Sequence, residues 1–170
     1  AFIAVFMSMG FVLLACSTSQ QPETGNRLII GTQFDIGGSM DPRMGLGGPS
    51  LAPKLLVFET PVYFDENYVM KPLLLTAWRH APDCQEWVFT LRRGVRFSDG
   101  TPFDAHALIF SIRYMSSSGS AYANIASMDA LDPHTVRVRL KKPDAVFLHR
   151  ISTLPVMSPG CVDDQGRFVK

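Results

Sequence analysis

The chain has 170 residues, of which 46% are hydrophobic, and it carries 16 basic and 15 acidic side chains. This apolar content is enough to build a folded core, so it excludes a chain that is disordered throughout. The near balance of charge, a net +1 at neutral pH, gives no reason to expect nucleic acid as a partner.

An uncharged apolar segment opens the chain and runs from Ala1 to Ala15. It is shorter than the roughly 20 apolar residues of a membrane-spanning helix, so we interpret residues 1–15 as a signal peptide rather than a signal anchor. The residues Leu-Leu-Ala before Cys16 resemble a bacterial lipobox, which implies that Cys16 is lipidated and becomes the first mature residue. A signal peptide normally begins with Met and a basic residue. We therefore expect further residues before Ala1.

Residues 16–26 follow as a predicted flexible tether, because nothing after Cys16 in this stretch is apolar enough to be buried. Residues 27–170 are long enough for one domain of ordinary size. Two cysteines, Cys84 and Cys161, lie in this body. An oxidising compartment would permit them to pair, but their distance in sequence leaves the pairing open.

The first half of the body predicts mixed elements. Residues 28–32 predict a short buried strand, followed by a glycine-rich loop over residues 36–48. Apolar residues spaced i, i+4 and i+7 predict a helix over residues 49–59. Strict alternation over residues 87–92 predicts a strand with one buried face. Asp-Gly at residues 99–100 then predicts a turn.

The clearest helix follows that turn. Asp104 is suited to cap it, and Leu108, Ile112 and Met115 lie at the spacing of one helical face. The serine-rich residues 116–120 predict a loop after the helix.

Two further elements are predicted near the end of the chain. Residues 135–140 alternate apolar and polar side chains and predict a strand, with Asp132 and Pro133 forming the turn before it. A short helix is plausible over residues 146–151.

The residues from Trp87 to Ala105 read WVFTLRRGVRFSDGTPFDA. This run resembles the signature of the bacterial extracellular solute-binding proteins of family 5, which serve importers of dipeptides, oligopeptides and nickel. Shorter similarities at residues 39–42, 71–78, 131–136 and 140–143 extend the resemblance over nearly everything after the tether. The helix start departs from the family pattern, because an acidic residue usual after Ala105 is absent.

The resemblance implies an α/β, periplasmic binding protein-like fold of type II, which has two lobes in the full-length family. Residues 27–170 would then hold the first strand of the main lobe and most of a small mixed α/β subdomain. Because family members are several hundred residues longer, we expect this chain to be an incomplete N-terminal part. The implied partners are an ABC permease and its ATPase, a peptide or metal-chelate ligand, and the membrane through Cys16. The implied location is extracytoplasmic or periplasmic, and we expect a monomer.

The resemblance also indicates ligand-contacting residues. Phe34 and Asp35 correspond to a loop that lines the ligand cleft in the family, where an acid can meet an amino group. Tyr122 corresponds to an aromatic residue that faces the ligand, although ordinary packing explains it equally well. Nickel-chelate binders carry an arginine three positions earlier, where this chain has Gly119, which weakens that ligand type without excluding other metal chelates.

No combination of residues predicts catalysis, a metal site or a cofactor. Ser98, Asp99 and His106 lack the nucleophile elbow and oxyanion loop of a triad hydrolase, and Asp99 is explained by its turn. The potential metal ligands at residues 80–84 match no strong zinc spacing, and the glycines at residues 45–50 lack a phosphate-loop ending. We therefore expect a non-enzymatic binding lipoprotein. The alternative is an exported interaction or signalling lipoprotein that takes no part in transport.

Overall fold

A computed structural model describes residues 40–44, 54, 56–117 and 122–169 of the chain. All of them lie in the unit Thr32–Lys170. The predictions for the signal peptide, Cys16, the tether over residues 16–26, the first strand, Phe34, Asp35 and Gly119 fall outside the described residues. Within the described ranges, no helix is both long enough and apolar enough to cross a membrane.

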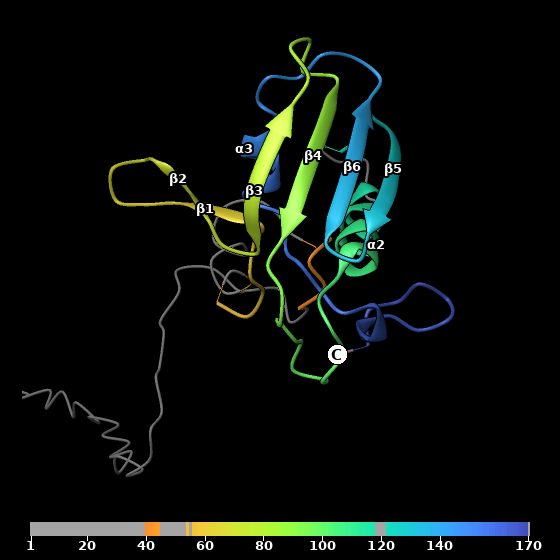
Figure 1. The fold of residues 1–170 in the computed structure, drawn as a ribbon. Coiled ribbons are helices and arrows are strands. Elements are labelled where there is room, and N and C mark those ends of the chain that lie inside the picture. Colours follow the sequence, from red (N-terminus) through yellow and green to blue (C-terminus); the bar gives the residue numbers. More distant parts are fainter. Residues whose placement is uncertain (1–39, 45–53, 55, 118–121, 170) are drawn as a thin grey trace, which may run out of the picture. The chain divides into compact units, whose positions relative to one another are not determined.

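A four-stranded antiparallel sheet forms the centre of the described structure (Figure 1). Its strands are β3 (Leu75–His80), β4 (Glu86–Leu91), β5 (Ile125–Asp132) and β6 (Thr135–Leu140), in the spatial order β3-β4-β6-β5. The two strands predicted from alternation, β4 and β6, are confirmed and pair with each other in the middle of the sheet. The edge strands β3 and β5 were not predicted from periodicity.

The inner face of the two central strands follows the predicted pattern, but the outer face is partly buried as well. Phe89 lies opposite Val136, and both are fully buried. Val88 points the other way and is still only 7% exposed, so the prediction of a single buried face is wrong at this position. Its cross-strand neighbours are Arg79 and Arg137, whose long aliphatic stems can cover a small apolar side chain.

The edge strands differ from the central pair in their regularity. The β4–β6 register runs without a shift from Glu86 opposite Arg139 to Thr90 opposite Thr135. By contrast, β3 has an irregularity at residues 75–77, and β5 has irregularities at residues 125–127 and 130–132. Each extra residue breaks the alternation of side chains, which explains why the sequence pattern did not reveal these strands.

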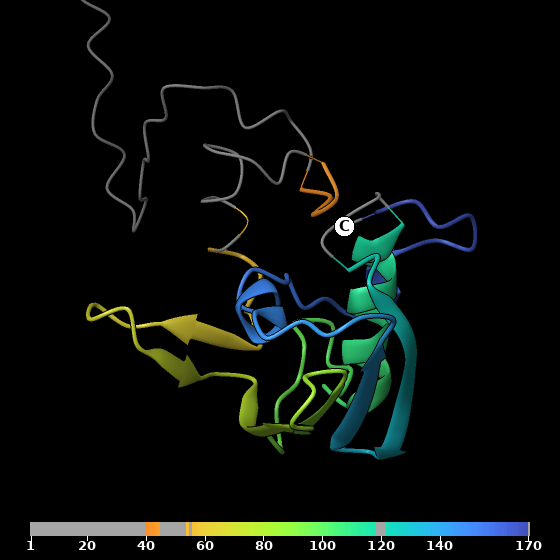
Figure 2. The same ribbon diagram turned by 90° about the horizontal axis from the view of Figure 1, so that it is seen from above.

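Two helices cover one face of the sheet (Figures 1 and 2). The first, α2 (Ala105–Ser116), confirms the predicted helix and extends slightly into the serine-rich segment. Asp104 caps it as predicted, because its Oδ1 accepts a hydrogen bond of 3.0 Å from the backbone N–H of Ala107. The second, α3 (Phe147–Ile151), confirms the short helix predicted near the end.

The core lies between this sheet face and the helices. Leu108, Ile112 and Met115 of α2 are all buried, as their spacing predicts. From α3, the ring of Phe147 lies 6.3 Å from that of Phe89 and 5.9 Å from that of Trp87, measured between centroids. Aromatic pairs at these separations contribute both buried area and ring–ring attraction.

A second, two-stranded sheet precedes the main one. It is a hairpin of β1 (Val62–Phe64) and β2 (Met70–Pro72), and it extends away from the main body (Figure 2). Tyr68 in its turn is 87% exposed and has a φ of 57°. Strands of three residues carry too little pattern to be predicted from alternation.

The helix predicted to continue to Glu59 is wrong at its C-terminal end. The backbone N–H groups of Val57 and Phe58 both donate to the carbonyl of Lys54, which closes one turn, and residues 56–59 are not helical. Phe58 is nevertheless buried. Its burial explains the apolar spacing on which the prediction of a longer helix relied.

The turn at residues 99–100 is confirmed. Gly100 has a φ of 85°, a conformation that favours glycine, and its N–H donates to the carbonyl of Phe97. Cys84 is a free thiol, so the possible Cys84–Cys161 disulfide is not formed between these two described residues. A 3₁₀ turn, η2 (Pro159–Cys161), completes the described elements.

Candidate functional site

The described part of the chain begins with a tight turn at Asp41, six residues after Asp35. The backbone N–H of Met44 donates to the carbonyl of Asp41 at 3.0 Å, and the Asp41 carboxylate accepts from the N–H of Arg43 at 2.9 Å. Aspartate at the first position and proline at the second favour such a turn, because proline presets φ and the carboxylate bonds the backbone two residues on. The sequence Asp-Pro therefore fixes this turn locally.

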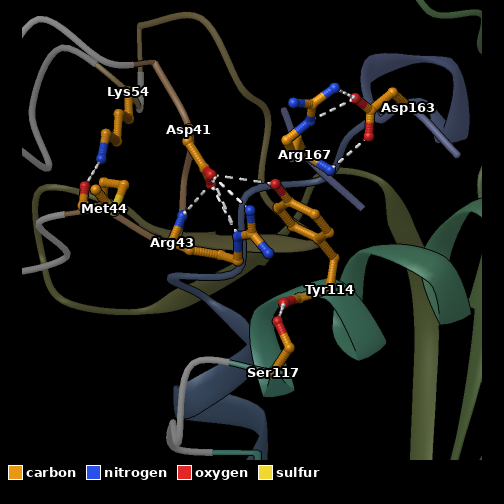
Figure 3. A network of polar contacts seen from close by, with 8 residues as sticks. All are labelled: Asp41, Arg43, Met44, Lys54, Tyr114, Ser117, Asp163 and Arg167. Atoms are coloured by element: carbon orange, nitrogen blue, oxygen red, sulfur yellow. Dashed lines mark hydrogen bonds and ion pairs between the residues drawn. The ribbon is translucent and has the colours of Figure 1, made fainter. Parts of the chain in front are cut away.

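The Asp41 carboxylate also connects the turn to helix α2 (Figure 3). Arg43 donates to it through Nη2 at 2.9 Å and through Nε at 3.2 and 3.3 Å. Tyr114 of α2 donates its hydroxyl to Oδ2 at 3.2 Å. The guanidinium carbon of Arg43 lies 4.0 Å from the centre of the Tyr114 ring, which adds a cation–π contact. We refer to Asp41, Arg43 and Tyr114 as the turn anchor.

Burial and charge act in opposite directions on the turn anchor. Burial alone would raise the pKa of Asp41, but the hydrogen bonds from Arg43, its positive charge and the Tyr114 hydroxyl outweigh burial and hold that pKa below its ordinary value. Burial, followed by the negative charge of Asp41, raises the pKa of Tyr114 to about 12. Asp41 is therefore ionised and Tyr114 neutral at physiological pH.

Further charged residues surround the turn anchor. Lys54 is almost fully buried, and its ammonium group donates to the carbonyl of Met44. Burial lowers the pKa of Lys54, and the charge of Asp41 opposes part of that effect. On the opposite side, Arg167 forms a 2.8 Å ion pair with Asp163 (Figure 3). The turn thus lies among fixed charges of both signs.

The contacts of the turn anchor suit a structural role. Its carboxylate, guanidinium and hydroxyl bond to one another, which leaves the group poorly suited to serve as a nucleophile with a general base. Among the described residues, no group of three or more His, Cys, Asp or Glu side chains is placed to hold a metal ion. The anchor ties the turn at residues 41–44 to helix α2.

The residues considered for catalysis and metal binding have structural explanations where they are described. Asp99 accepts hydrogen bonds from the N–H and hydroxyl of Thr101, at 2.9 and 2.6 Å, as expected for its turn. At the other end of the sheet, the sulfur of Cys84 lies 3.7 Å from Nδ1 of His80 in the turn between β3 and β4. His80 and Cys84 are therefore two potential metal ligands side by side, and in the described part of the chain they belong to no group of three.

Tyr122 lies in the core rather than on an open surface. Its side chain is 4% exposed, and its hydroxyl donates to the carbonyl of Arg150 at 3.1 Å. Burial raises the pKa of this tyrosine to about 12. These contacts agree with the packing alternative, while contact with a ligand stays a prediction.

Sequence reasoning predicted neither the turn anchor nor its partners. Asp-Pro is a signal for a turn, but nothing near Asp41 in the sequence indicates that its carboxylate meets Tyr114, 73 residues later. A partial signal was available on the helix. A tyrosine beside the apolar face of α2 needs a partner for its hydroxyl when it is buried.

A separate cavity of 580 Å³ lies near the turn anchor. Its walls are mainly apolar and are formed by Met40, residues 57–59, Leu74, the segment from Val95 to Phe103, and the segment from Val156 to Phe168. Neither Tyr122 nor the residues of the turn anchor line it. Among the described residues, the cavity is therefore distinct from both Tyr122 and the turn anchor.

Comparison with protein families gives one match that covers more than half of the chain. Residues 69–167 match the model of bacterial extracellular solute-binding proteins, family 5 middle region. This range includes the whole of the four-stranded sheet and both helices.

Individual proteins agree with that match. The probable D,D-dipeptide-binding periplasmic protein DdpA of Escherichia coli is 35% identical over 83 residues, which are 46% of this chain and 16% of that protein. The glutathione-binding protein GsiB of Escherichia coli is 28% identical over 113 residues, which are 62% of this chain and 22% of that protein.

Among solved structures, an ABC transporter substrate-binding protein from Sinorhizobium meliloti superposes with a TM-score of 0.70 and 29% identity. The superposition covers 78% of this chain and 29% of that one. The chain therefore spans less than a third of the length of each of these three proteins. Its fold is the corresponding part of a type II periplasmic binding protein.

Proposed function

The chain belongs to the bacterial extracellular solute-binding proteins of family 5, and on that premise we propose that the full-length protein is the substrate-binding component of an ABC importer. It captures a small solute outside the inner membrane and delivers it to the permease. The observation that carries this proposal is the family match over residues 69–167, which spans a contiguous, folded region rather than a short motif.

The proposed ligands are short peptides or a metal chelate. DdpA and GsiB are named for binding D,D-dipeptides and glutathione, and this favours small peptides for the present chain. Such ligands carry an ammonium group and a carboxylate at close spacing. A binding site for them needs both an acidic and a basic partner, along with apolar surface for side chains.

Phe34, Asp35 and Tyr122 are the proposed ligand contacts from this part of the protein. Asp35 would pair with a ligand ammonium group. The turn anchor supports this role for the segment, because Asp41 ties its C-terminal end to Tyr114 of α2. A loop whose end is fixed loses less conformational entropy when a ligand binds.

We further propose that the protein is anchored to the membrane through a lipid on Cys16. A Cys16→Ala variant of the full-length protein should move from the membrane fraction to the soluble extracytoplasmic fraction. Cys84→Ala is the matched control, because Cys84 lies in a turn of the folded body, and it should leave the protein on the membrane. Retention of Cys16→Ala on the membrane would contradict lipid anchoring.

The binding proposal is tested by native mass spectrometry of the full-length protein, produced without its lipid signal and purified gently. A peptide receptor should carry added masses that resolve into a set of short peptides. A metal-chelate receptor should carry one adduct with a metal isotope pattern. Because a receptor can also lose its ligand during purification, a second measurement is needed.

That measurement is a thermal unfolding series of the same protein with D-alanyl-D-alanine, glutathione, trialanine and nickel–histidine. Solute binding to the folded state raises Tm, by an amount that grows with solute concentration. Asp35→Ala should reduce the shift, whereas Glu23→Ala in the tether should not. A protein with no adduct and no shift with any of these probes would refute the proposed function.

A further inference from the structure

The turn between β3 and β4, at the upper end of the sheet in Figure 1, brings a thiol and an imidazole together. The sulfur of Cys84 lies 3.7 Å from Nδ1 of His80. Both groups are metal ligands: thiolate sulfur binds Cu(I) and zinc, and imidazole nitrogen binds copper and zinc. Neither residue is a proposed solute contact, and neither lines the cavity. The pair is therefore a separate candidate site.

The backbone of the turn fixes Cys84. Its N–H donates to the carbonyl of Ala81 at 2.9 Å, and its own carbonyl accepts from Nε1 of Trp87 at 3.3 Å and from the N–H of Asp144 at 3.2 Å. Cys84 has a φ of 55°, a conformation that favours glycine, so the backbone gives no reason for a cysteine at this position. The thiol is half-buried. Its place beside His80 is thus set by the folded hairpin.

The imidazole of His80 is held in place as well, and it remains accessible. Its ring lies 4.7 Å from that of Trp87, measured between centroids, with 40° between the two planes. Nδ1 lies 2.9 Å from the carbonyl oxygen of Ala81, which accepts the proton when Nδ1 carries it. Because His80 is exposed, solvent can move that proton to Nε2. The Nδ1 lone pair is then free to bind an ion, and the imidazole stays neutral.

The spacing and the number of ligands indicate the class of ion. Bonds of about 2.3 Å to sulfur and about 2.0 Å to nitrogen allow the two ligand atoms to lie up to about 4.3 Å apart around one ion. The observed 3.7 Å is within that limit. Zinc sites use three or four protein ligands, whereas the described residues offer no group of three His, Cys, Asp or Glu side chains here. Cu(I) prefers soft ligands and forms stable complexes with only two of them, so this pair suits it better.

We propose that His80 and Cys84 form a binding site for a soft monovalent cation of the Cu(I) type. The ion lies between Nδ1 of His80 and the sulfur of Cys84. On binding, the thiol releases one proton to solvent, because the metal ligand is the thiolate, while the neutral imidazole keeps its proton on Nε2. The occupied site is neutral overall. The proposal does not rest on the proposed function, since it involves none of the proposed solute contacts.

The test is alkylation of Cys84 with N-ethylmaleimide in the full-length protein, produced without its lipid signal and kept free of oxygen and of solute. The probe is Cu(I) buffered with bicinchoninate, so that a single thiol cannot compete for the ion. The modification rate of each cysteine is followed by peptide mass spectrometry, with and without Cu(I). Cys161 is the internal control, because it is also half-buried but lies in η2 and not in this turn.

We expect Cu(I) to slow the alkylation of Cys84 at least about tenfold, because only the metal-free fraction reacts, and to leave the rate of Cys161 unchanged. His80→Gln should abolish this protection, since losing a direct ligand should weaken binding by at least about a hundredfold. His149→Gln is the matched control, as His149 is also exposed but lies on α3, and protection should persist in it. No protection of Cys84 would overturn the proposal. Equal protection in His80→Gln would also overturn it, because the thiol would then act alone.

Two further measurements complete the test. Zn(II) at the same free concentration should protect Cys84 less than Cu(I) does, and equal protection would contradict the assignment to a soft monovalent ion. Without any alkylation, Cu(I) should raise the Tm of the wild type more than that of Cys84→Ser, because the ion binds the folded state. Equal rises in Tm would contradict the site. Since the metal alone is the probe, failure here is distinguishable from failure to bind solute.

Discussion

The sheet with its helices and the region of the turn anchor around Asp41, called the edge below, are stabilised in different ways. In the sheet region, apolar side chains from β4, β6, α2 and α3 bury one another completely, and the elements follow from periodic patterns in the sequence. At the edge, short turns are joined by polar contacts between residues far apart, and an apolar cavity remains open. The comparison indicates that the sheet region depends on buried apolar contacts, whereas the edge depends on polar contacts between residues far apart in the sequence.

The largest loss of stability in the sheet region is expected for Phe89→Ala. Phe89 is fully buried in the central strand and contacts the rings of Trp87 and Phe147. Removing a buried ring of this kind costs about 3–5 kcal/mol of unfolding free energy. Urea unfolding should show this loss in full, while Thr90→Ala, on the exposed side of the same strand, should change little. A loss below about 1 kcal/mol would contradict the packing described for this strand.

At the edge, Asp41→Asn should have the next largest effect. The substitution keeps the shape of the side chain but leaves the Arg43 guanidinium without its counter-charge. Because Arg43 is partly exposed, we expect a loss of about 1–3 kcal/mol, less than for a fully buried pair. A double-mutant cycle with Tyr114→Phe should give a positive coupling energy in urea unfolding. Strict additivity of the two substitutions would show that the 3.2 Å hydrogen bond contributes nothing.

The pH dependence of the same variant sharpens this result. The pKa of Asp41 in the folded protein lies below its unfolded value of about 3.9, so ionised Asp41 stabilises the fold at higher pH. That contribution is lost as the pH falls through the folded pKa. The gap between wild type and Asp41→Asn should therefore be constant from neutral pH to about 5 and shrink below about 4. A gap that widened on acidification would contradict the direction of the shift.

Tyr122 lies between the two cases, because it is packed in the core and is also a proposed ligand contact. Tyr122→Phe removes the hydrogen bond to the Arg150 carbonyl and should cost about 1 kcal/mol in urea unfolding. Since that hydroxyl is already bonded within the protein, we expect the aromatic ring, and not the hydroxyl, to contact the solute. Solute affinity should survive in Tyr122→Phe and weaken in Tyr122→Leu. Unchanged affinity in Tyr122→Leu would leave packing as its only role.

The smallest effect is expected on the outer face of the sheet. Arg139 pairs there with Glu86 at 3.0 Å and with Asp129 at 3.5 Å, and its side chain is 47% exposed. Exposed ion pairs of this kind contribute no more than about 0.5–1 kcal/mol, so Arg139→Ala should change the unfolding free energy by less than that. The effect should decrease at high salt. A larger and salt-independent loss would indicate that Arg139 acts through packing.

The same division separates what could be predicted from the sequence from what could not. Strands β4 and β6 and helix α2 can be recognised in the sequence, because buried apolar side chains recur in each at a fixed spacing. The Asp104 cap is visible because its donor, the N–H of Ala107, is three residues away. The Lys54–Phe58 turn was mistaken for the end of a longer helix, because Phe58 would be buried in a helix and is also buried in the turn. The turn anchor joins residues 41 and 114, and no local pattern encodes such a contact.

The irregular register of the edge strands has a consequence for solubility. An edge strand exposes unpaired backbone groups, and a regular one is a template onto which another chain can add. Here the regular pair β4 and β6 is enclosed, while β3 and β5 each carry extra residues that interrupt the row of backbone donors and acceptors. The sheet therefore presents neighbouring molecules with edges that are hard to extend, which protects the subdomain from forming intermolecular β-structure and aggregating.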